Sequence, residues 1–78
     1  YNINIKNISN LDEYRFVLSE LEKIIILSDL KINYLSFNEV NLSSLLIGNY
    51  KQLEKLFINY PFLRLESLES DKLSLMFE

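Results

Sequence analysis

The 78-residue chain contains no cysteine, no histidine and no tryptophan, and it has a single glycine and a single proline. Without cysteine or histidine, neither a Ser-His-Asp nor a Cys-His catalytic site can form, and zinc loses its usual ligands. One glycine is too few for the glycine-rich loops that hold phosphates or dinucleotides. The acidic residues that remain, such as Asp12 and Glu13, fall at polar helix or turn positions. We therefore expect no enzymatic activity, no metal and no cofactor.

Positive charge is also scarce. The chain has 8 Lys and Arg residues and 11 Asp and Glu residues, which gives a net charge of −3. Phosphate binding needs a basic face, so we expect no nucleic-acid partner. The longest apolar run, Ile24 to Leu27, is far shorter than the ~20 residues that span a bilayer, and we expect no membrane span in this fragment.

What the chain does contain is typical of a folded domain, with 49% hydrophobic and 24% charged residues. Alanine and threonine are absent, while residues with AT-rich codons dominate, which indicates an AT-rich genome. The chain begins at Tyr1 without a signal-like segment. We expect residues 1–78 to form one domain, cut from a longer protein or present as a mature form.

An internal repeat appears when Ile8 is placed over Ile47. Each copy has an asparagine suited to cap a helix, Asn10 or Asn49, followed three residues later by Glu13 or Gln52. In a capping box, that third side chain reaches back to the N–H of the cap residue. Both copies continue with one apolar helical stripe, formed by residues 11, 14, 17, 18 and 21 and by residues 50, 53, 56, 57 and 60. Pro61 is expected to stop the second helix.

Outside the helices, apolar residues alternate with polar ones, as in strands. The pattern predicts strands around residues 3–5, 30–34, 40–46, 63–66 and 73–77, with turns at Asn38-Glu39 and Ser70-Asp71. The duplicated βαβ order predicts an α+β, ferredoxin-like βαββαβ sandwich, with both helices on one face of an antiparallel sheet. The additional C-terminal strand is expected to extend one edge of that sheet by a hairpin with the fourth strand.

Some apolar residues fall on the wrong face of this predicted fold. Phe16 lies opposite the apolar stripe of the first helix, and five other residues have the parity of the open sheet face. A contiguous apolar patch would mark an interaction surface, whereas isolated apolar residues are ordinary at protein surfaces. The candidate interaction surface comprises Phe16, Leu35, Phe37, Leu45, Ile47 and Met76.

The apolar spacing also resembles a known family. It consists of Ile5-x-x-Ile8-x-x-Leu11-x-Glu13-Tyr14-x-x-Val17-Leu18-x-x-Leu21, Leu46-x-Gly48-Asn49-x-x-x-Leu53 and Leu73-x-Leu75. This pattern resembles the C-terminal domain of a family of uncharacterised proteobacterial envelope proteins with a domain of unknown function. The resemblance implies a periplasmic or cell-envelope location and a non-enzymatic role. The chain departs from the family at Ile25-Ile26, where a Pro-Gly-like turn is usual.

Two binding functions remain open at this point, beside a purely structural spacer that would have no partner. The first is a protein-interaction or assembly domain of a larger bacterial envelope protein, acting through its sheet face or an edge strand on a protein partner or on a second copy in a homodimer. The alternative is a small-molecule-sensing regulatory domain that resembles amino-acid-binding modules. Its ligand would lie where the first strand meets its helix, near Asn7, Ser9 and Asn10.

Overall fold

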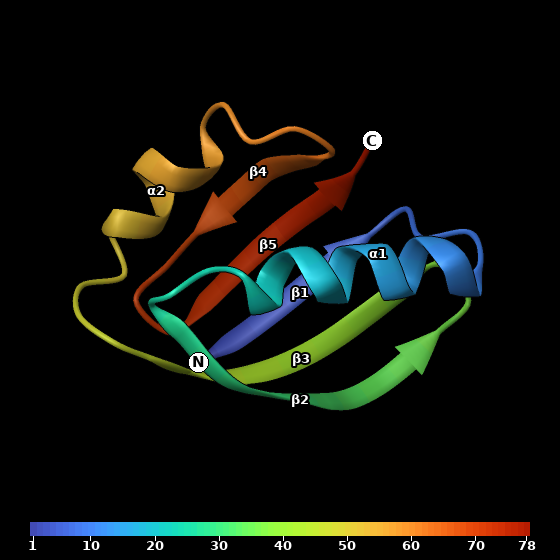
Figure 1. The fold of residues 1–78 in the computed structure, drawn as a ribbon, viewed down its shortest axis with the longest axis horizontal. Coiled ribbons are helices and arrows are strands. Elements are labelled where there is room, and N and C mark those ends of the chain that lie inside the picture. Colours follow the sequence, from blue (N-terminus) through green and yellow to red (C-terminus); the bar gives the residue numbers. More distant parts are fainter.

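The computed structural model describes all of residues 1–78 as one five-stranded sheet with two helices (Figure 1). The strands are β1 (Asn2–Lys6), β2 (Leu27–Ser36), β3 (Glu39–Leu46), β4 (Leu63–Leu68) and β5 (Lys72–Phe77). Helix α1 (Leu11–Glu22) follows β1, and helix α2 (Gln52–Phe57) follows β3. The predicted α+β class and the order of the seven elements are confirmed.

The sheet has the order β2-β3-β1-β5-β4 and is mixed. Strand β3 is antiparallel to β1 and to β2, while β5 runs parallel to β1 and antiparallel to β4. The prediction of an antiparallel sheet is therefore wrong. The prediction that the last strand extends an edge is also wrong, because β5 does form a hairpin with β4 but lies between β4 and β1. Figure 1 shows β1 and β5 side by side in the middle of the sheet.

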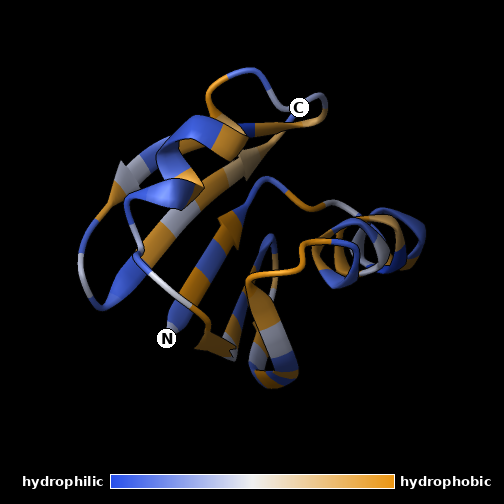
Figure 2. Cartoon of the chain, turned by 60° about the vertical axis from the view of Figure 1, so that its left-hand side comes forward, coloured by the Kyte–Doolittle hydropathy of each residue, from blue (hydrophilic) through white to orange (hydrophobic).

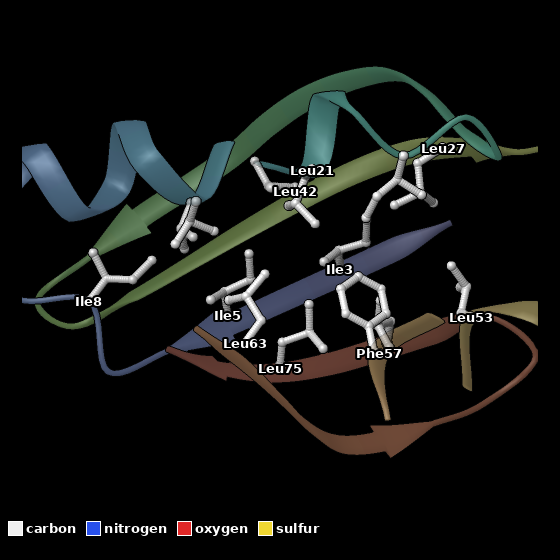
Figure 3. Close-up of a cluster of buried hydrophobic side chains, with 14 residues drawn as sticks. Ile3, Ile5, Ile8, Leu21, Leu27, Leu42, Leu53, Phe57, Leu63 and Leu75 are labelled. Carbon is white, nitrogen blue, oxygen red and sulfur yellow. The ribbon is translucent and has the colours of Figure 1, made fainter. Parts of the chain in front are cut away.

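A single hydrophobic core lies between the sheet and the two helices. The alternate residues Ile3 and Ile5 of β1 are fully buried, whereas Asn2 and Lys6 are exposed, and Figure 2 shows this alternation of hydropathy along the strand. Both helices place buried residues in the same cluster, so both lie on one face of the sheet, as predicted. Figure 3 shows the cluster, which includes Leu21 of α1, Leu53 and Phe57 of α2, and Leu42, Leu63 and Leu75 of the sheet.

Helix α1 begins where the sequence predicts. Asn10 has an extended backbone, and its Oδ1 accepts a hydrogen bond from the Glu13 N–H at 2.9 Å. In a capping box the Glu13 side chain would accept from the N–H of the cap residue, Asn10. Here Glu13 Oε1 accepts instead from the N–H of Ser9, one residue earlier, at 2.7 Å. Two backbone N–H groups at the start of the helix are thereby satisfied.

Loss of this cap gives a measurable prediction. We expect Asn10→Ala to lower the free energy of unfolding by about 1 kcal/mol, because the Glu13 N–H loses its side-chain acceptor. Urea denaturation followed by circular dichroism measures the change. Asn59→Ala is the matched control, since Asn59 is exposed and its side chain makes no hydrogen bond, and it should cost less than about 0.5 kcal/mol. Equal losses in the two variants would show that the cap contributes nothing specific.

Helix α2 begins later than predicted. The side chain of Asn49 accepts from the N–H of Lys51, two residues on, which is the bond of an Asx turn and not of a helix cap. The next N–H groups, from Gln52 to Glu54, bond to carbonyls three residues back, so the chain makes a tight 3₁₀-like turn before the α-helix. Gly48 enters this turn with φ +95°, a conformation that other residues rarely adopt.

Candidate functional site

The six residues predicted to form an interaction surface lie in different parts of the structure. Leu45 keeps the predicted position on the open sheet face, opposite Ser28 of β2, and Ile47 follows the end of β3. Met76 is only partly exposed, and its sulfur accepts from an Arg64 N–H at 3.0 Å. Phe16, Leu35 and Phe37 lie elsewhere. The six residues therefore do not share one open-face patch, and their role in binding stays a prediction.

Phe16 belongs to an aromatic cluster at the end of β5. Its ring lies edge-on to Phe62 at a centroid distance of 5.0 Å and to Phe77 at 6.2 Å. These separations are typical of favourable aromatic pairs. Phe62 follows Pro61 with φ +74°, an unusual backbone for a bulky residue. Phe16 is thus partly covered by neighbours that the helical pattern of α1 alone could not reveal.

Leu35 lies on the helix side of the sheet, contrary to its predicted parity. The pairing of β2 with β3 shifts between Ile32 and Tyr34, and beyond that shift Leu35 is paired with the buried Val40. An extra residue in one strand moves every later side chain to the other face. This irregularity gives Leu35 its place beside α1.

Leu35 and Phe37 border a pocket of about 210 Å³ between the start of α1 and the β2–β3 hairpin. We call it the hairpin pocket. Six of its ten lining residues are hydrophobic, and three of these, Leu11, Leu35 and Phe37, are largely exposed. The complete lining is Ile8, Ser9, Asn10, Leu11, Tyr14, Leu35, Ser36, Phe37, Glu39 and Val40.

The structure brings two of the three residues of the alternative ligand site to this pocket. Ser9 and Asn10 line it, but Asn7 does not, and the Asn7 side-chain amide instead donates to the Phe77 carbonyl at 2.8 Å. The Asn10 Oδ1 and the Ser9 N–H are already used in the cap of α1. The polar groups proposed for ligand recognition therefore act mainly in the local fold.

Tyr14 adds a polar group that the sequence pattern did not single out. Tyr14 is one of the residues that line the pocket, and its hydroxyl is buried away from solvent without a hydrogen-bond partner. Most buried polar groups are paired, and an unpaired one costs about 1–3 kcal/mol. The helical stripe identifies Tyr14 as a core residue, but no sequence signal shows that its hydroxyl lacks a partner.

The pocket adjoins a free edge of the sheet. Strands β2 and β4 are the two edges, and they differ in length and in where their charged residues lie. The six-residue β4 carries Arg64, which forms ion pairs with Glu66 and Glu78 at 4.0 and 3.7 Å. The ten-residue β2 has no charged residue after Lys31. Charged side chains protect sheet edges from pairing, so the part of β2 after Lys31 is less protected than β4, whereas its first half carries the ion pair of Asp29 and Lys31.

The open face of the sheet is polar at its centre. Asn41 is nearly buried there, where its Nδ2 donates to the Oδ1 atoms of Asn2 and Asn4 at 2.9 and 3.3 Å. Its own Oδ1 accepts from Asn33, at 2.8 Å, and Asn33 in turn accepts from the Ser43 hydroxyl. Because these side-chain amides are hydrogen-bonded to one another, the centre of the open face is not an apolar docking surface.

Shifted pKa values occur away from the hairpin pocket. Burial raises the pKa of the Tyr1 hydroxyl to about 12, and the nearby Asp71, Tyr50 and Glu69 add to this effect. Burial, together with the Glu20 carboxylate, also raises the pKa of Tyr60. Both hydroxyls therefore stay protonated at neutral pH.

No group of three or more His, Cys, Asp or Glu side chains lies close enough together to hold a metal ion. Neither helix combines the length and the apolar composition needed to cross a membrane.

The chain was compared with family models, curated proteins and solved structures. No family model, curated protein or solved structure matches it. The resemblance to the envelope-protein family therefore stays a prediction, and the hairpin pocket with its adjoining edge is the feature on which a function can be argued.

Proposed function

We propose that this domain is a non-catalytic interaction module that docks a segment of a protein partner at the hairpin pocket, beside the free edge of β2. The observation that carries the proposal is the collection of largely exposed apolar side chains, Leu11, Leu35 and Phe37, around one pocket. Exposed apolar side chains that gather around a pocket mark interaction sites more often than scattered ones do.

The size of the pocket favours docking over sensing of a free ligand. Pockets for small molecules usually have volumes of about 300–1,000 Å³. The hairpin pocket, at about 210 Å³, is smaller and suits one side chain. A side-chain pocket next to an unpaired strand is the arrangement used in strand addition, where main-chain bonds supply affinity and the pocket supplies specificity.

A matched pair of variants tests the docking site. Leu35 and Leu45 are 56% and 61% exposed, and they lie on opposite faces of the sheet. We expect Leu35→Glu to reduce capture of partner proteins by at least about tenfold, because it places a carboxylate beside an apolar pocket. Leu45→Glu should leave capture unchanged. Quantitative mass spectrometry of proteins retained by each variant, from an extract of the source cells, measures the effect.

Each other outcome contradicts a named part of the proposal. Loss of capture with Leu45→Glu alone would move the interaction to the open sheet face. Capture that is unaffected in both variants would remove the docking function. If the only retained protein is the chain itself, the mass in solution would show a dimer, and the partner would be a second copy.

The small-molecule alternative has one observation in its favour, which is that Ser9 and Asn10 line the pocket. Thermal-shift screening against amino acids and nucleotides tests it. A true ligand at 100 times its dissociation constant should add about 2.7 kcal/mol to the free energy of unfolding. No shift across the panel would leave the interaction module as the proposed function.

We also propose that the fold is a variant of the ferredoxin-like βαββαβ plan. Strand β3 lies between β1 and β2, so the first βαβ unit is split by one strand. The second unit, β3-α2-β4, is split by two strands, because β5 is inserted beside β1. The envelope location stays a prediction that rests on the resemblance, and fractionation of cells that express the parent protein would test it.

A further inference from the structure

We infer that two copies of this chain pair through α1, with the two helices antiparallel about a twofold axis at Leu18. The surface that carries the inference is a row of residues along one side of α1, which we call the outer stripe. It consists of Leu11, Arg15, Leu18 and Glu22. The inference concerns a second copy of the chain, so it is separate from the docking of a partner segment at the hairpin pocket.

The outer stripe lies on one side of the helix. Its members are spaced alternately by four and three residues, which is the spacing of side chains that face a second helix. Leu11 lines the hairpin pocket together with Leu35, so this side of α1 is turned toward the β2–β3 hairpin. The other side carries Phe16, whose ring lies edge-on to that of Phe62. Figure 2 views α1 nearly end-on and shows it set apart from α2.

The charges of the outer stripe have no opposite charge within the chain. Leu11, Arg15 and Glu22 are exposed, and the ion pairs of the chain include neither Arg15 nor Glu22. These two side chains lie two turns apart, about 10 Å along the helix axis, so they do not pair with each other. Ile32 of β2 is 51% exposed, although it is paired with the buried Leu42. A second helix alongside α1 has room to cover this surface.

The order of the charges favours a second copy in the antiparallel orientation. Leu18 lies near the middle of the outer stripe, with Arg15 on its N-terminal side and Glu22 on its C-terminal side. When the two Leu18 side chains face each other in an antiparallel pair, each Arg15 faces the Glu22 of the other copy. A parallel pair would place like charges together, which is unfavourable. The stripe is therefore complementary to itself in one orientation only.

The residues beside the outer stripe repeat this arrangement. Asp12 and Lys23 also lie on opposite sides of Leu18, so the antiparallel pair brings each of them close to the other type. Lys23 bonds to Glu20 at 3.2 Å, but its side chain is 71% exposed and accessible to a second carboxylate. A different protein would not require a row of charges that is complementary to itself, and for this reason we assign the partner as a second copy.

Charge reversal tests the pairing. We expect sedimentation equilibrium to show a concentration-dependent dimer of the 78-residue chain. Arg15→Glu and Glu22→Arg should each raise its dissociation constant roughly tenfold, because two pairs of opposite charges become two pairs of like charges. The double variant that carries both substitutions should regain the original dissociation constant. Lys55→Glu, a charge reversal at an exposed residue of α2, is the control and should change nothing.

A mixture of the two single variants gives the sharpest result. In the mixed dimer of Arg15→Glu with Glu22→Arg, both contacts join opposite charges, so its share should exceed the roughly one half that random pairing gives. Native mass spectrometry separates the three dimers by mass. Both substitutions also suit the helix, since acidic residues stabilise its N-terminal part and basic residues its C-terminal part. Circular dichroism should therefore show both variants folded.

Three results would overturn the inference. They are a chain that stays monomeric up to about 1 mM, a dimer that Arg15→Glu does not weaken, and a mixture without preference for the mixed dimer. None of these measurements depends on capture of another protein. Failure of the α1 pairing is therefore distinct from failure of the docking function, which Leu35→Glu tests.

Discussion

We expect Phe57→Ala to lower the free energy of unfolding by about 3–5 kcal/mol. The Phe57 side chain is 1% exposed and lies in the core cluster, with its ring 5.2 Å from that of Tyr60. Helix α2 has only six residues, too few for a stable isolated helix, so Phe57 and Leu53 are what hold it on the sheet. A domain of this length has a total stability on the order of 5 kcal/mol. The substitution should therefore leave a large unfolded fraction.

Phe37→Ala is the matched control for this prediction, because it makes the same change at a residue that is 96% exposed. It should change the free energy of unfolding by no more than about 0.5 kcal/mol. Urea denaturation of the two variants, followed by far-ultraviolet circular dichroism, compares them directly. A small loss in Phe57→Ala would mean that α2 does not pack on the sheet as Figure 3 shows.

The second large effect concerns the position of β5. We expect Ser74→Pro to lower the free energy of unfolding by at least about 3 kcal/mol. Ser74 is nearly buried and is paired with Asn4 on one side and with Ser67 on the other. A proline there removes an N–H from the middle of the sheet and places its ring against a neighbouring strand. The thermal midpoint and the circular dichroism spectrum of the variant report the loss.

Glu66→Pro is the control, and it also tests the strand order. Glu66 lies on the edge strand β4, at the point where the pairing with β5 skips one residue. Proline is tolerated at edges and bulges, so the cost should stay below about 1 kcal/mol. If Ser74→Pro were as mild as Glu66→Pro, β5 would have to lie at an edge, as the sequence pattern alone suggested.

The sequence predicted the elements better than their arrangement. Period-two alternation, such as Ile3 and Ile5 alternating with Asn2, Asn4 and Lys6, is a local property, and every strand found by it is present. The start of α1 is equally local, because Asn10 reaches only to Glu13. Asn49 instead accepts a hydrogen bond from the N–H of Lys51, two residues on, and helix α2 begins two residues later than predicted, at Gln52. An asparagine can make either bond, and the sequence does not distinguish them.

The prediction of the arrangement was wrong where the arrangement depends on contacts between residues far apart in the sequence. A hairpin with β4 can place β5 on either side of that strand, and hydrophobic parity is the same in both cases. Burial of Leu73 and Leu75 beside β1 favours the inner position, and this contact joins distant parts of the chain. The candidate site also depends on strand pairing, because Leu35 lines the hairpin pocket only as a result of the register shift between β2 and β3.

The parallel pairing of β1 with β5 has a consequence for how the chain folds. Its register joins Asn2 to Lys72 and Lys6 to Met76, which lie at opposite ends of the sequence. Closing such a long loop is entropically costly, and contacts of this kind slow folding. The hairpins β2–β3 and β4–β5 can form early, as separate halves with short connections. The central strand β1 then links the halves, so we expect the joining of β1 to β5 to limit the folding rate.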